Sequence, residues 1–555
     1  MFRWTPIVAT ALAAVSLLAL FVQPVNSQRR PGLPNQPGQP GGSEGDWFNL
    51  GPMGGKATME SAGGKTGLTV RKVFEGGPAA AAGLKEGDFI LGAPKDFVKD
   101  AYHELGAAIE AAECAKKDKE AIVELTLGRG GQTRTLKVQV RAFGPEAKKF
   151  PGGKMRDTIV DESLKWLASQ QQGDGGWECH LSGENGRTVM TSLCGLAFLA
   201  AGHTAGSGEY KTNVKKAADF VVANVGQEGA FGNMGGGANW NQTNWGLGYG
   251  GIFLAEVQSA SAVPGVKEKL EWICDRIQAN MEATGGFAHG PGGPNALNYL
   301  ELEIVSNYCV AALGGIQANG IKVDKSRIER ALAYIQACGG GKGGVGYSTR
   351  EGQIGWGDPG RTGGAIMAFG AVGRDNHEYY KSMVAFLGGN LHDIIDGHVS
   401  PTMHHLSAAA ACRREGGKLW DSYWEAQRHE CTMLRNPDST FTGRPTKESQ
   451  TMGRNNDMDL GPVWNTAHWT IILCLEKDNL PVWMGKGGKG KKPGKEEPKE
   501  PAKEPPPEVK APVTPSQGDK PQTPEGEPEP EPAPKAPEPK KPAPPKEKKP
   551  VEPED

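Results

Sequence analysis

Polar and ionisable residues recur near the expected N-termini of a series of apolar helices in the second half of the chain. Acids, imidazoles and an arginine gathered at helix N-termini can bind an anion or carry out acid–base chemistry. The same residue types also serve as ordinary helix caps and turn formers, so both interpretations stay open. The catalytic candidates are Asp174, Asp358, Arg361, Asp396, His398, His404 and His468. Residues expected to line the same end of the helices are Trp177, Trp245, Glu303, Asn307, Arg361 and His405, with Glu184 and Arg187 nearby.

The densest group among these residues is Asp396-Gly397-His398, followed by His404 and His405. Imidazoles this close in sequence raise the question of a metal site. Neighbouring residues on one helix point in different directions, so only one of His404 and His405 can face His398. Cys179-His180 and His429-Glu430-Cys431 have no partner at a metal-ligand spacing. We therefore expect neither a metal site nor another cofactor.

The elements that position these residues are predicted by an internal repeat between about Asp157 and Val482. Each unit reads as a helix, a glycine-rich loop with a large side chain, and a second helix rich in alanine and glycine. The stretch LKWLASQQQGDGGWEC, from Leu164 to Cys179, contains the first loop. The loop side chains recur about every fifty residues, at Trp177, Phe231, Phe287, Val345, His398 and Phe441. Six such units predict about twelve helices.

A helix pair with one helix of small residues indicates two layers, because the inner helix is crowded on both faces. Six pairs can close into a ring, an all-α (α/α)6 toroid, which we place at residues 155–483. Trp166-Leu167, Gln171 and Gly175-Gly176-Trp177 resemble the glutamine–tryptophan motif of the prenyltransferase and squalene-cyclase repeat superfamily. The resemblance implies the toroid fold.

The motifs that carry the activities of that superfamily are missing. Its triterpene cyclases use an Asp-x-Asp-Asp cluster, and the nearest stretch here, Asp457-Met458-Asp459-Leu460, lacks the third acid. Its protein prenyltransferases hold zinc through an Asp-x-Cys motif, which does not occur in this chain. We therefore expect neither terpene cyclase nor protein prenyltransferase activity.

A smaller folded block, residues 46–145, precedes the repeats and reads as a mixture of strands and helices. TGLTVRKVF alternates as a strand, FVKDAYHELGAAIEAAECAKK has helical spacing, and AIVELTLGRGGQTRTLKVQV reads as a hairpin with a glycine turn. Gly77-Pro78-Ala79, Ala82-Gly83-Leu84 and Gly87-Asp88-Phe89-Ile90-Leu91 resemble a PDZ domain of the bacterial exported type. The fold class is therefore a small α+β PDZ-like domain followed by the toroid.

The PDZ resemblance implies a peptide-binding loop, which we place at Asn49–Ala57. Such domains add an extended peptide as a strand and hold its terminal carboxylate on backbone N–H groups. Pro52 removes one of these N–H groups, so a purely structural or docking role stays open beside peptide binding. The residues implied to bind peptide are Leu50, Gly51, Gly54, Thr69, Val70 and His103.

The two ends of the chain differ in composition from the blocks between them. Arg3 and the apolar run Ile7–Val22 are typical of a signal peptide at residues 1–27, cleaved before Gln28, with an uncleaved anchor as the alternative. A Pro/Gly linker follows at 28–45, and residues 484–555 predict a disordered tail rich in Pro, Lys and Glu. We expect an exported protein, periplasmic or secreted, without a membrane span after signal cleavage.

Charge and cysteine content narrow the range of partners. The 62 Lys and Arg residues balance 64 Asp and Glu, which argues against a nucleic-acid partner. Nine cysteines at irregular spacing are not a disulfide framework, although a bridge such as Cys179 to Cys194 stays open.

The domain pair resembles exported bacterial proteins and implies no particular activity. The favoured function is an extracytoplasmic scaffold that binds a peptide or protein C-terminus, or a cell-envelope polymer, rather than an enzyme. The alternative is a toroid-based hydrolase acting on a carbohydrate or peptide.

Overall fold

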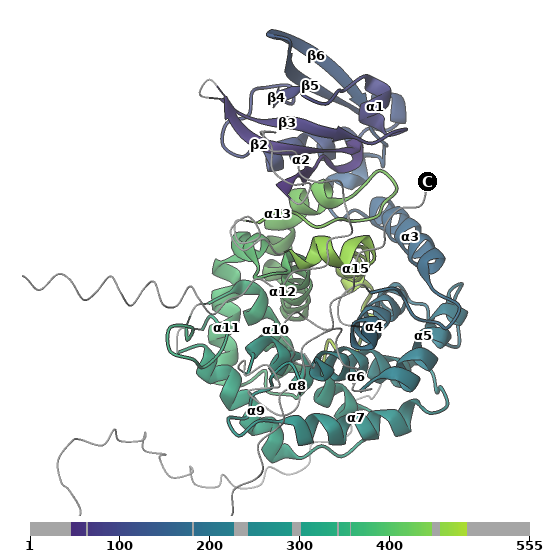
Figure 1. Ribbon diagram of the computed structural model, residues 1–555, viewed down its shortest axis with the longest axis vertical. Coiled ribbons are helices and arrows are strands. Elements are labelled where there is room, and N and C mark those ends of the chain that lie inside the picture. The colour runs from purple at the N-terminus through teal and green to yellow at the C-terminus, as the bar shows by residue number, and fades with distance from the viewer. Residues whose placement is uncertain are drawn as a thin grey trace, which may run out of the picture. The chain divides into compact units, whose positions relative to one another are not determined.

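The computed structural model describes residues 46–62, 65–179, 183–226, 242–290, 301–340, 343–355, 357–446 and 455–485 (Figure 1). The predicted signal peptide, linker and nearly all of the predicted tail lie outside these residues, as do Phe231 and His180 and the side chain of Glu184. The predicted start of the tail at residue 484 is wrong by a short margin, because Met484 is buried in the toroid.

The first folded unit of the chain, here called the sheet domain, is a single antiparallel sheet with two helices. The strands follow one another in space as they do in sequence. They are β1 (Phe48–Asn49), β2 (Gly55–Ala62), β3 (Lys65–Val73), β4 (Phe89–Gly92), β5 (Ile122–Arg129) and β6 (Gln132–Gln139). The helices are α1 (Pro78–Ala82) and α2 (Ala101–Glu113).

Two local predictions for the sheet domain have different outcomes. The hairpin is present: β5 and β6 pair in register from Ile122 opposite Gln139, and Gly130 and Gly131 supply the positive φ angles that the tight turn needs. The loop predicted to run to Ala57 is shorter, because β2 already begins at Gly55. Phe48 pairs with Ala57 across the loop, and a single 3-10 turn fills Gly51–Met53.

The rest of the described chain forms six helix pairs. They are α3 (Gly153–Gln170) with α4 (Gly183–Ala201), α5 (Lys211–Asn224) with α6 (Thr243–Ala260), α7 (Val266–Asn280) with α8 (Glu303–Ala318), α9 (Lys325–Cys338) with α10 (Pro359–Ala371), α11 (Glu378–Gly389) with α12 (Pro401–Glu415), and α13 (Gly417–Leu434) with α15 (Asn456–Cys474). The second helices contact one another in the order α4, α6, α8, α10, α12 and α15, and α15 contacts α4 again (Figure 1). This closed inner ring confirms the α/α toroid.

Side-chain size explains which helix of each pair is inside. The outer helix α9 buries one stripe only, Ile328, Leu332 and Ile335 among its members, as an amphipathic helix does. The inner helix α8 is buried on all sides from Glu303 to Ile316. Its Gly314 leaves no space for a side chain, since a Cβ there would lie 2.6 Å from the carbonyl oxygen of Ala371 in α10. Small residues are what allow neighbouring inner helices to approach this closely.

A hydrogen bond recurs at the corner between the two helices of a pair. The backbone N–H of the loop side chain donates to a Ser or Thr hydroxyl of the inner helix. This bond joins Trp177 to Thr191 (3.1 Å), Phe287 to Ser306 (3.1 Å), Val345 to Thr362 (2.9 Å) and Phe441 to Thr466 (2.9 Å). The large loop residues are therefore structural anchors of the repeat.

The glycines of these corners are fixed by a close approach to the next outer helix. Gly175, Gly285 and Gly343 have φ angles of 93°, 94° and 81°. A Cβ on Gly175 would lie 2.5 Å from the carbonyl oxygen of Lys216 in α5. Gln171 completes the first corner by donating to the carbonyl oxygens of Gly175 (2.9 Å) and Asn213 (3.1 Å). The stretch LKWLASQQQGDGGWEC is thus a packed corner of the toroid.

The C-terminal segment 478–485 crosses the C-terminal ends of the inner helices. Asn479 donates to the carbonyl oxygen of Ala200 in α4 (3.1 Å), and Arg414 of α12 donates to the carbonyl oxygen of Met484. The backbone N–H of Trp483 donates to Glu256 Oε1 in α6 (2.6 Å). Among the described residues, no helix combines the length and apolarity needed to cross a membrane.

Glu256 makes this end of the toroid sensitive to pH. Burial raises its pKa from 4.5 to about 8, and the backbone N–H groups of Trp483 and Val482 lower it only in part. The folded state therefore binds a proton more tightly than the unfolded state, and the free energy of unfolding falls as pH rises from 4.5 to about 8. We expect Glu256→Gln to remove most of this slope and to add roughly 2–4 kcal/mol at the upper end of the range. Urea unfolding at several pH values measures it, and an unchanged slope would contradict the assignment.

Candidate functional site

The N-terminal ends of α8, α10 and α12 bring several of the predicted residues together. Asp358 precedes α10 and accepts a hydrogen bond from the backbone N–H of Arg361 (2.7 Å), as an N-cap residue does. The same carboxylate oxygen lies 2.9 Å from Nδ1 of His404, which is buried in α12. One acid thus both starts α10 and holds an imidazole of the next inner helix.

Glu303, the first residue of α8, is fully buried beside this pair. Its Oε1 accepts a hydrogen bond from Asn307 Nδ2 (2.5 Å), and the same amide nitrogen donates to the carbonyl oxygen of Arg361 (3.2 Å). Glu303 Oε2 and Asn307 Oδ1 are buried without a hydrogen-bond partner. Buried polar atoms are nearly always paired, so this local shortage is unusual.

Arg361 lies over the ring of Tyr347, with its guanidinium carbon 4.9 Å from the ring centre. Only 7% of its surface is exposed, and within the part of the chain that the structure describes its guanidinium has no hydrogen-bond partner. His398 packs edge-on against Tyr347 at 5.2 Å between ring centres. Glu303, Asn307, Asp358, Arg361 and His404, with Tyr347, are here called the α8–α10–α12 site.

The two acids of this site have pKa values shifted in opposite directions. Burial raises the pKa of Glu303 well above 4.5, and Arg361 and Asn307 offset this only in part. Burial also acts on Asp358, but His404 and Arg361 outweigh it and lower its pKa below 3.8. Glu303 therefore holds its proton more tightly than an ordinary glutamate, whereas Asp358 ionises more readily than an ordinary aspartate. Such a split is the usual arrangement of an acid and a base in one site.

The other predicted site residues lie elsewhere in the toroid. Asp174 is exposed at the first corner and binds Arg187 at 2.7 Å, and Trp177 is fully buried in the core. Asp396 is exposed at the end of the 3-10 turn Leu391–Asp396. Trp245 donates its indole N–H to Nδ1 of His289 (2.8 Å).

His405 and His468 are both buried and held neutral. Burial lowers the pKa of each to about 3. His468 Nδ1 lies 2.8 Å from the carbonyl oxygen of Trp464, and His405 packs 5.0 Å from Trp469 between ring centres. His404 and His405 thus face different neighbours, and only His404 belongs to the α8–α10–α12 site.

The sheet-domain loop predicted to bind peptide is covered by the toroid. Leu50 is fully buried, and a Cβ on Gly51 would lie 3.0 Å from the carbonyl oxygen of Thr432. A Cβ on Gly54 would lie 3.1 Å from Pro437. Thr69 and Val70 belong to β3, one strand further into the sheet than the strand that follows the loop.

His103 of α2 also contacts the toroid. Its Nε2 lies 2.8 Å from Glu430 of α13, while its Nδ1 lies 2.5 Å from Asp100. Two further ion pairs join α2 to this part of the toroid: Arg428 of α13 binds Glu110 (2.8 Å), and Arg435, just after α13, binds both oxygens of Glu113 (2.6 and 2.7 Å). The sheet domain and α13 therefore meet in a charged, largely buried interface.

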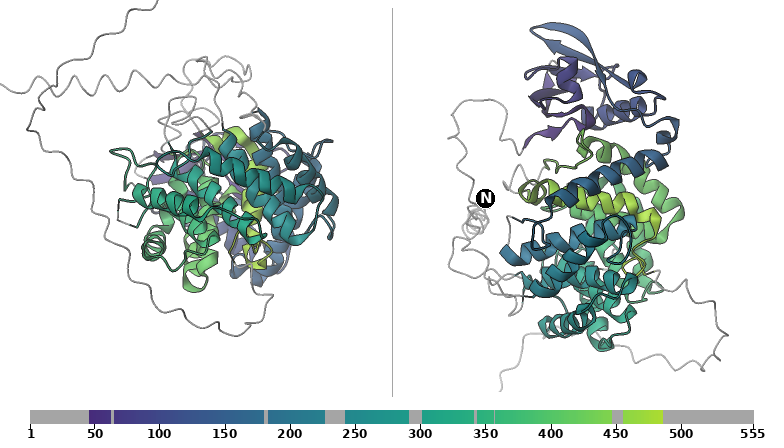
Figure 2. Two further views of the ribbon diagram at one scale, coloured as in Figure 1. Left: turned by 90° about the horizontal axis from the view of Figure 1, so that it is seen from below. Right: turned by 90° about the vertical axis from the view of Figure 1, so that its right-hand side faces the viewer.

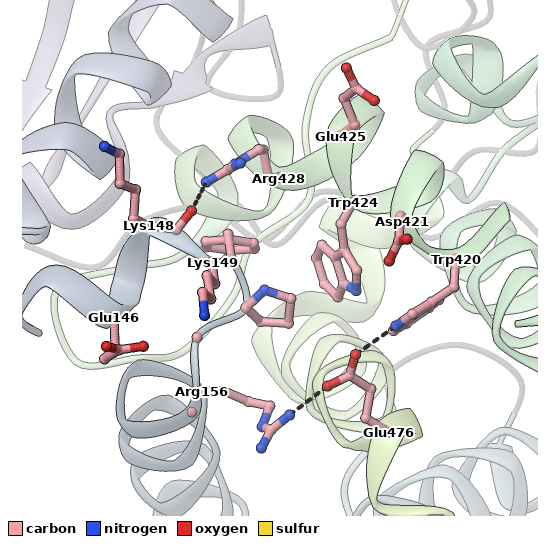
Figure 3. Close-up of a pocket in the computed structure, with 14 residues that line it drawn as sticks. Glu146, Lys148, Lys149, Arg156, Trp420, Asp421, Trp424, Glu425, Arg428 and Glu476 are labelled. Carbon is pink, nitrogen blue, oxygen red and sulfur yellow. Dashed lines mark hydrogen bonds and ion pairs between the residues drawn. The ribbon is translucent and has the colours of Figure 1, made fainter. Parts of the chain in front are cut away.

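A pocket of about 630 Å³ lies where the chain passes from the sheet domain to α3 (Figure 3). Glu476 crosses one side of it, accepting hydrogen bonds from Trp420 (2.7 Å) and Arg156 (2.8 Å). Trp424 and Phe150 meet edge-on at 5.3 Å in its wall. Trp420 and Arg156 are thus held by Glu476, whereas Trp424 Nε1 is buried without a hydrogen-bond partner.

Several contacts of these sites were absent from the sequence predictions. Tyr347 lies in a glycine-rich loop, and only its place two residues after the anchor Val345 marks it. No sequence motif marks Arg428 and Arg435, because their partners Glu110 and Glu113 are in another domain. Arg444 pairs with Glu430 within the toroid, and its guanidinium lies over the ring of Phe48 in the sheet domain. None of the nine cysteines, all of which lie among the described residues, forms a disulfide, so the bridge between Cys179 and Cys194 is absent.

A family model described as "Domain of unknown function (DUF6288)" matches residues 156–479, which is most of the toroid. The chain belongs to the DUF6288 family. The DUF6288 region thus coincides with the six helix pairs and leaves the sheet domain outside it. No curated protein matches the chain.

Solved structures similar to this DUF6288 chain include three toroid proteins. The GH76A alpha-1,6-mannanase from Salegentibacter sp. HEL1_6 has 8% identity and a TM-score of 0.42, covering 58% of this chain and 99% of the mannanase. A sugar epimerase from a ruminal bacterium has 12% identity and a TM-score of 0.40, with 58% and 99% covered. The type II terpene cyclase MstE from Scytonema has 12% identity and a TM-score of 0.37, with 59% and 99% covered.

Proposed function

We propose that the α8–α10–α12 site binds a small polar ligand of the carbohydrate class, and that the chain is an extracytoplasmic binding protein. The proposal is carried by one observation: three neighbouring polar groups have hydrogen-bonding capacity that the described residues leave unused. Two of them, Glu303 Oε2 and Asn307 Oδ1, are buried without a hydrogen-bond partner. The third is the Arg361 guanidinium, which stacks on Tyr347 and makes no hydrogen bond to the described residues. Unused polar groups concentrated at one place mark a position where a ligand supplies the missing partners.

The chemistry of these groups selects the ligand class. Arg361 offers only donors, Asn307 Oδ1 only accepts, and protonated Glu303 can donate. A ligand that satisfies all of them must donate and accept within a small volume, as adjacent hydroxyl groups of a sugar do. Tyr347 adds an aromatic surface at the rim of the site. An anionic sugar would in addition meet the charge of Arg361.

A binding measurement tests this proposal. Arg361→Gln removes the charged donors, and we expect it to weaken binding of a glycan identified on an array by at least about tenfold, the value of a charged hydrogen bond. Arg374→Gln is the matched control, because Arg374 is a partly exposed arginine that pairs with Glu329 on the outer surface. Calorimetric titration gives the affinities. Equal affinities for both variants, or no glycan bound by the wild-type chain, would refute the proposal.

The second candidate function, a toroid-based hydrolase, is favoured by the opposed pKa shifts of Glu303 and Asp358. A protonated Glu303 can give its proton to a leaving oxygen, and the ionised Asp358 can accept one from water. Two carboxyl groups in different protonation states are what glycoside hydrolysis requires. The test of this function is the effect of Glu303→Gln on the turnover of a bound glycan.

We also propose that the chain is exported and that the sheet domain is PDZ-like. Export is supported by Arg3, the apolar run Ile7–Val22 and the small residues Val25 and Ser27. The PDZ-like assignment is supported by the order of β2, β3, α1 and β4 around Gly87-Asp88, where Asp88 binds Arg129 at 2.6 Å. A mature protein that begins before Gln28 would argue against signal cleavage at the proposed site.

A further inference from the structure

The end of the sheet domain that carries the Leu50–Gly54 loop is filled by residues 429–437 of the toroid. Met433 is fully buried and belongs to the hydrophobic core of the sheet domain, not to that of the toroid. A Cβ on Gly106 of α2 would lie 3.0 Å from both the carbonyl oxygen of His429 and Cγ of Met433. Asn49 donates to Asn436 Oδ1 at 3.1 Å. The contacts come from both walls, the loop and helix α2.

This arrangement has the parts of a bound ligand. One apolar side chain, Met433, enters a pocket between the loop and α2, where it takes the position of an anchor residue. The backbone of Thr432 touches the glycine loop, and charged residues on either side are paired: Arg428 with Glu110 and Arg435 with Glu113. Glycine at positions 51, 54 and 106 is what allows the approach.

We propose that residues 429–437 are an intramolecular ligand of the sheet domain, so that an external peptide can reach the Leu50–Gly54 loop only after the two domains separate. While the two domains are in contact, the Leu50–Gly54 loop is occupied by residues 429–437 of the same chain. This proposal does not depend on a ligand at the α8–α10–α12 site, because the two sites are tested by different variants.

A charged cluster next to Met433 makes the docked state depend on pH. Glu430 accepts from Arg444 (2.8 Å) and lies 2.8 Å from His103 Nε2. Burial, which lowers the pKa of His103, is outweighed by Asp100 and Glu430, which raise it from 6.5 to about 9. Burial raises the pKa of Glu430, but Arg444 and His103 lower it to about 2. The titratable and charged groups that face this cluster from its own and the neighbouring elements are Asp100, His405, His429, Glu430 and Arg444.

The signs of these shifts define the pH range of the docked state. The contribution of His103 is complete below 6.5 and is lost as pH rises through about 9. The contribution of Glu430 is complete above 4.5 and is lost as pH falls toward about 2. Docking of the two domains is therefore strongest between pH 4.5 and 6.5. Starting from neutral pH, it weakens as the pH rises toward about 9.

Hydrogen exchange on the full chain tests the proposal with a steric wedge. Gly106→Leu places a side chain against His429 and Met433 of the toroid, and its nearest neighbours outside α2 all belong to the toroid. We expect amide exchange of residues 48–57 and 429–437 to become at least about tenfold faster together, while α5 to α9 keep their protection. Gly389→Leu is the control, because a Cβ at that helical glycine meets open space.

A second variant acts from the other side of the interface. Met433→Asp puts a charge into the apolar pocket and leaves the sheet-domain sequence unchanged. We expect the same two segments to lose protection, and the wild-type chain to show the same pattern when pH rises above 9. Unchanged exchange in both variants would overturn the proposal. Loss of protection across the whole chain would also overturn it, because the chain would then unfold as one unit without a state in which two folded domains have separated.

Discussion

Replacing Arg435 by Gln is expected to lower the free energy of unfolding by about 3–5 kcal/mol, the usual effect of removing one partner of a buried ion pair. Arg435 and Glu113 are both almost wholly buried, and the guanidinium bonds both carboxylate oxygens. Burial raises the pKa of Glu113 even with Arg435 in place. Without its partner the acid must stay buried and unpaired or take up a proton.

A double-mutant cycle separates the loss of the ion pair from the cost of leaving one charge buried without a partner. Glu113→Gln together with Arg435→Gln removes both charges and keeps the hydrogen-bonding capacity, so we expect most of the lost stability to return. The exposed pair Lys215 and Asp219 on α5 is the control and should change stability by less than about 1 kcal/mol. Urea unfolding provides the measurements. If the double variant is as unstable as Arg435→Gln alone, the uncompensated charge is not the cause.

Replacing Glu303 by Gln is expected to reduce turnover of a bound glycan by about 10²- to 10⁴-fold, the usual contribution of a general acid. Gln keeps the acceptor for Asn307 and the volume of the site, so affinity should change only slightly. Wild-type activity should depend on the protonated form of Glu303, and it should therefore fall as pH rises through the raised pKa of that carboxyl group.

The control for this experiment is Glu301→Gln, two residues earlier and partly exposed, where it accepts a hydrogen bond from Thr284 (3.3 Å). Its activity should match the wild type. Two outcomes separate the candidate functions of the site. Loss of turnover with retained binding supports the hydrolase, whereas a wild-type chain that binds the glycan without turning it over supports the binding protein alone.

The repeat was predictable because its signal is local. Trp177, Phe287 and Phe441 stand at similar distances from glycines and small-residue helices, and each repeats the same hydrogen bond to a Ser or Thr. Periodicity of this kind needs no knowledge of distant contacts. The ring closure between α15 and α4, about 270 residues apart, follows once the units are stacked.

The candidate site could be predicted only in part, because residue type does not reveal environment. Asp358, Arg361, His404 and Glu303 were among the predicted residues, and the structure brings them together. Asp174 and Trp177 have equally suggestive types, yet one is a turn residue and the other a core residue. The opposed pKa values of Glu303 and Asp358 arise from burial and neighbours on three different helices, which sequence spacing does not encode.

The interface between the domains was beyond prediction for the same reason. His103 and Glu430 are more than three hundred residues apart, and neither stands in a motif that names the other. The PDZ resemblance implied that Gly51 and Gly54 bind a peptide, and Thr432 and Pro437 of the toroid lie against them instead. A glycine in a loop indicates close approach, but not by which partner.

The closure of the ring places the sheet domain against both the first and the last helix pair of the toroid. A closed toroid joins its first and last units, so α3 lies against α15, and Ser163 of α3 donates to the carbonyl oxygen of Ser439 (2.7 Å). Arg141, at the end of the sheet domain, binds Glu162 of α3 (2.7 Å), while Arg435 beyond α13 binds Glu113. The sheet domain therefore spans the seam where the two ends of the ring meet. The ring can open between its first and last helix pairs, which no loop joins. Opening it there requires breaking the contacts between these pairs together with the contacts that each of them makes with the sheet domain.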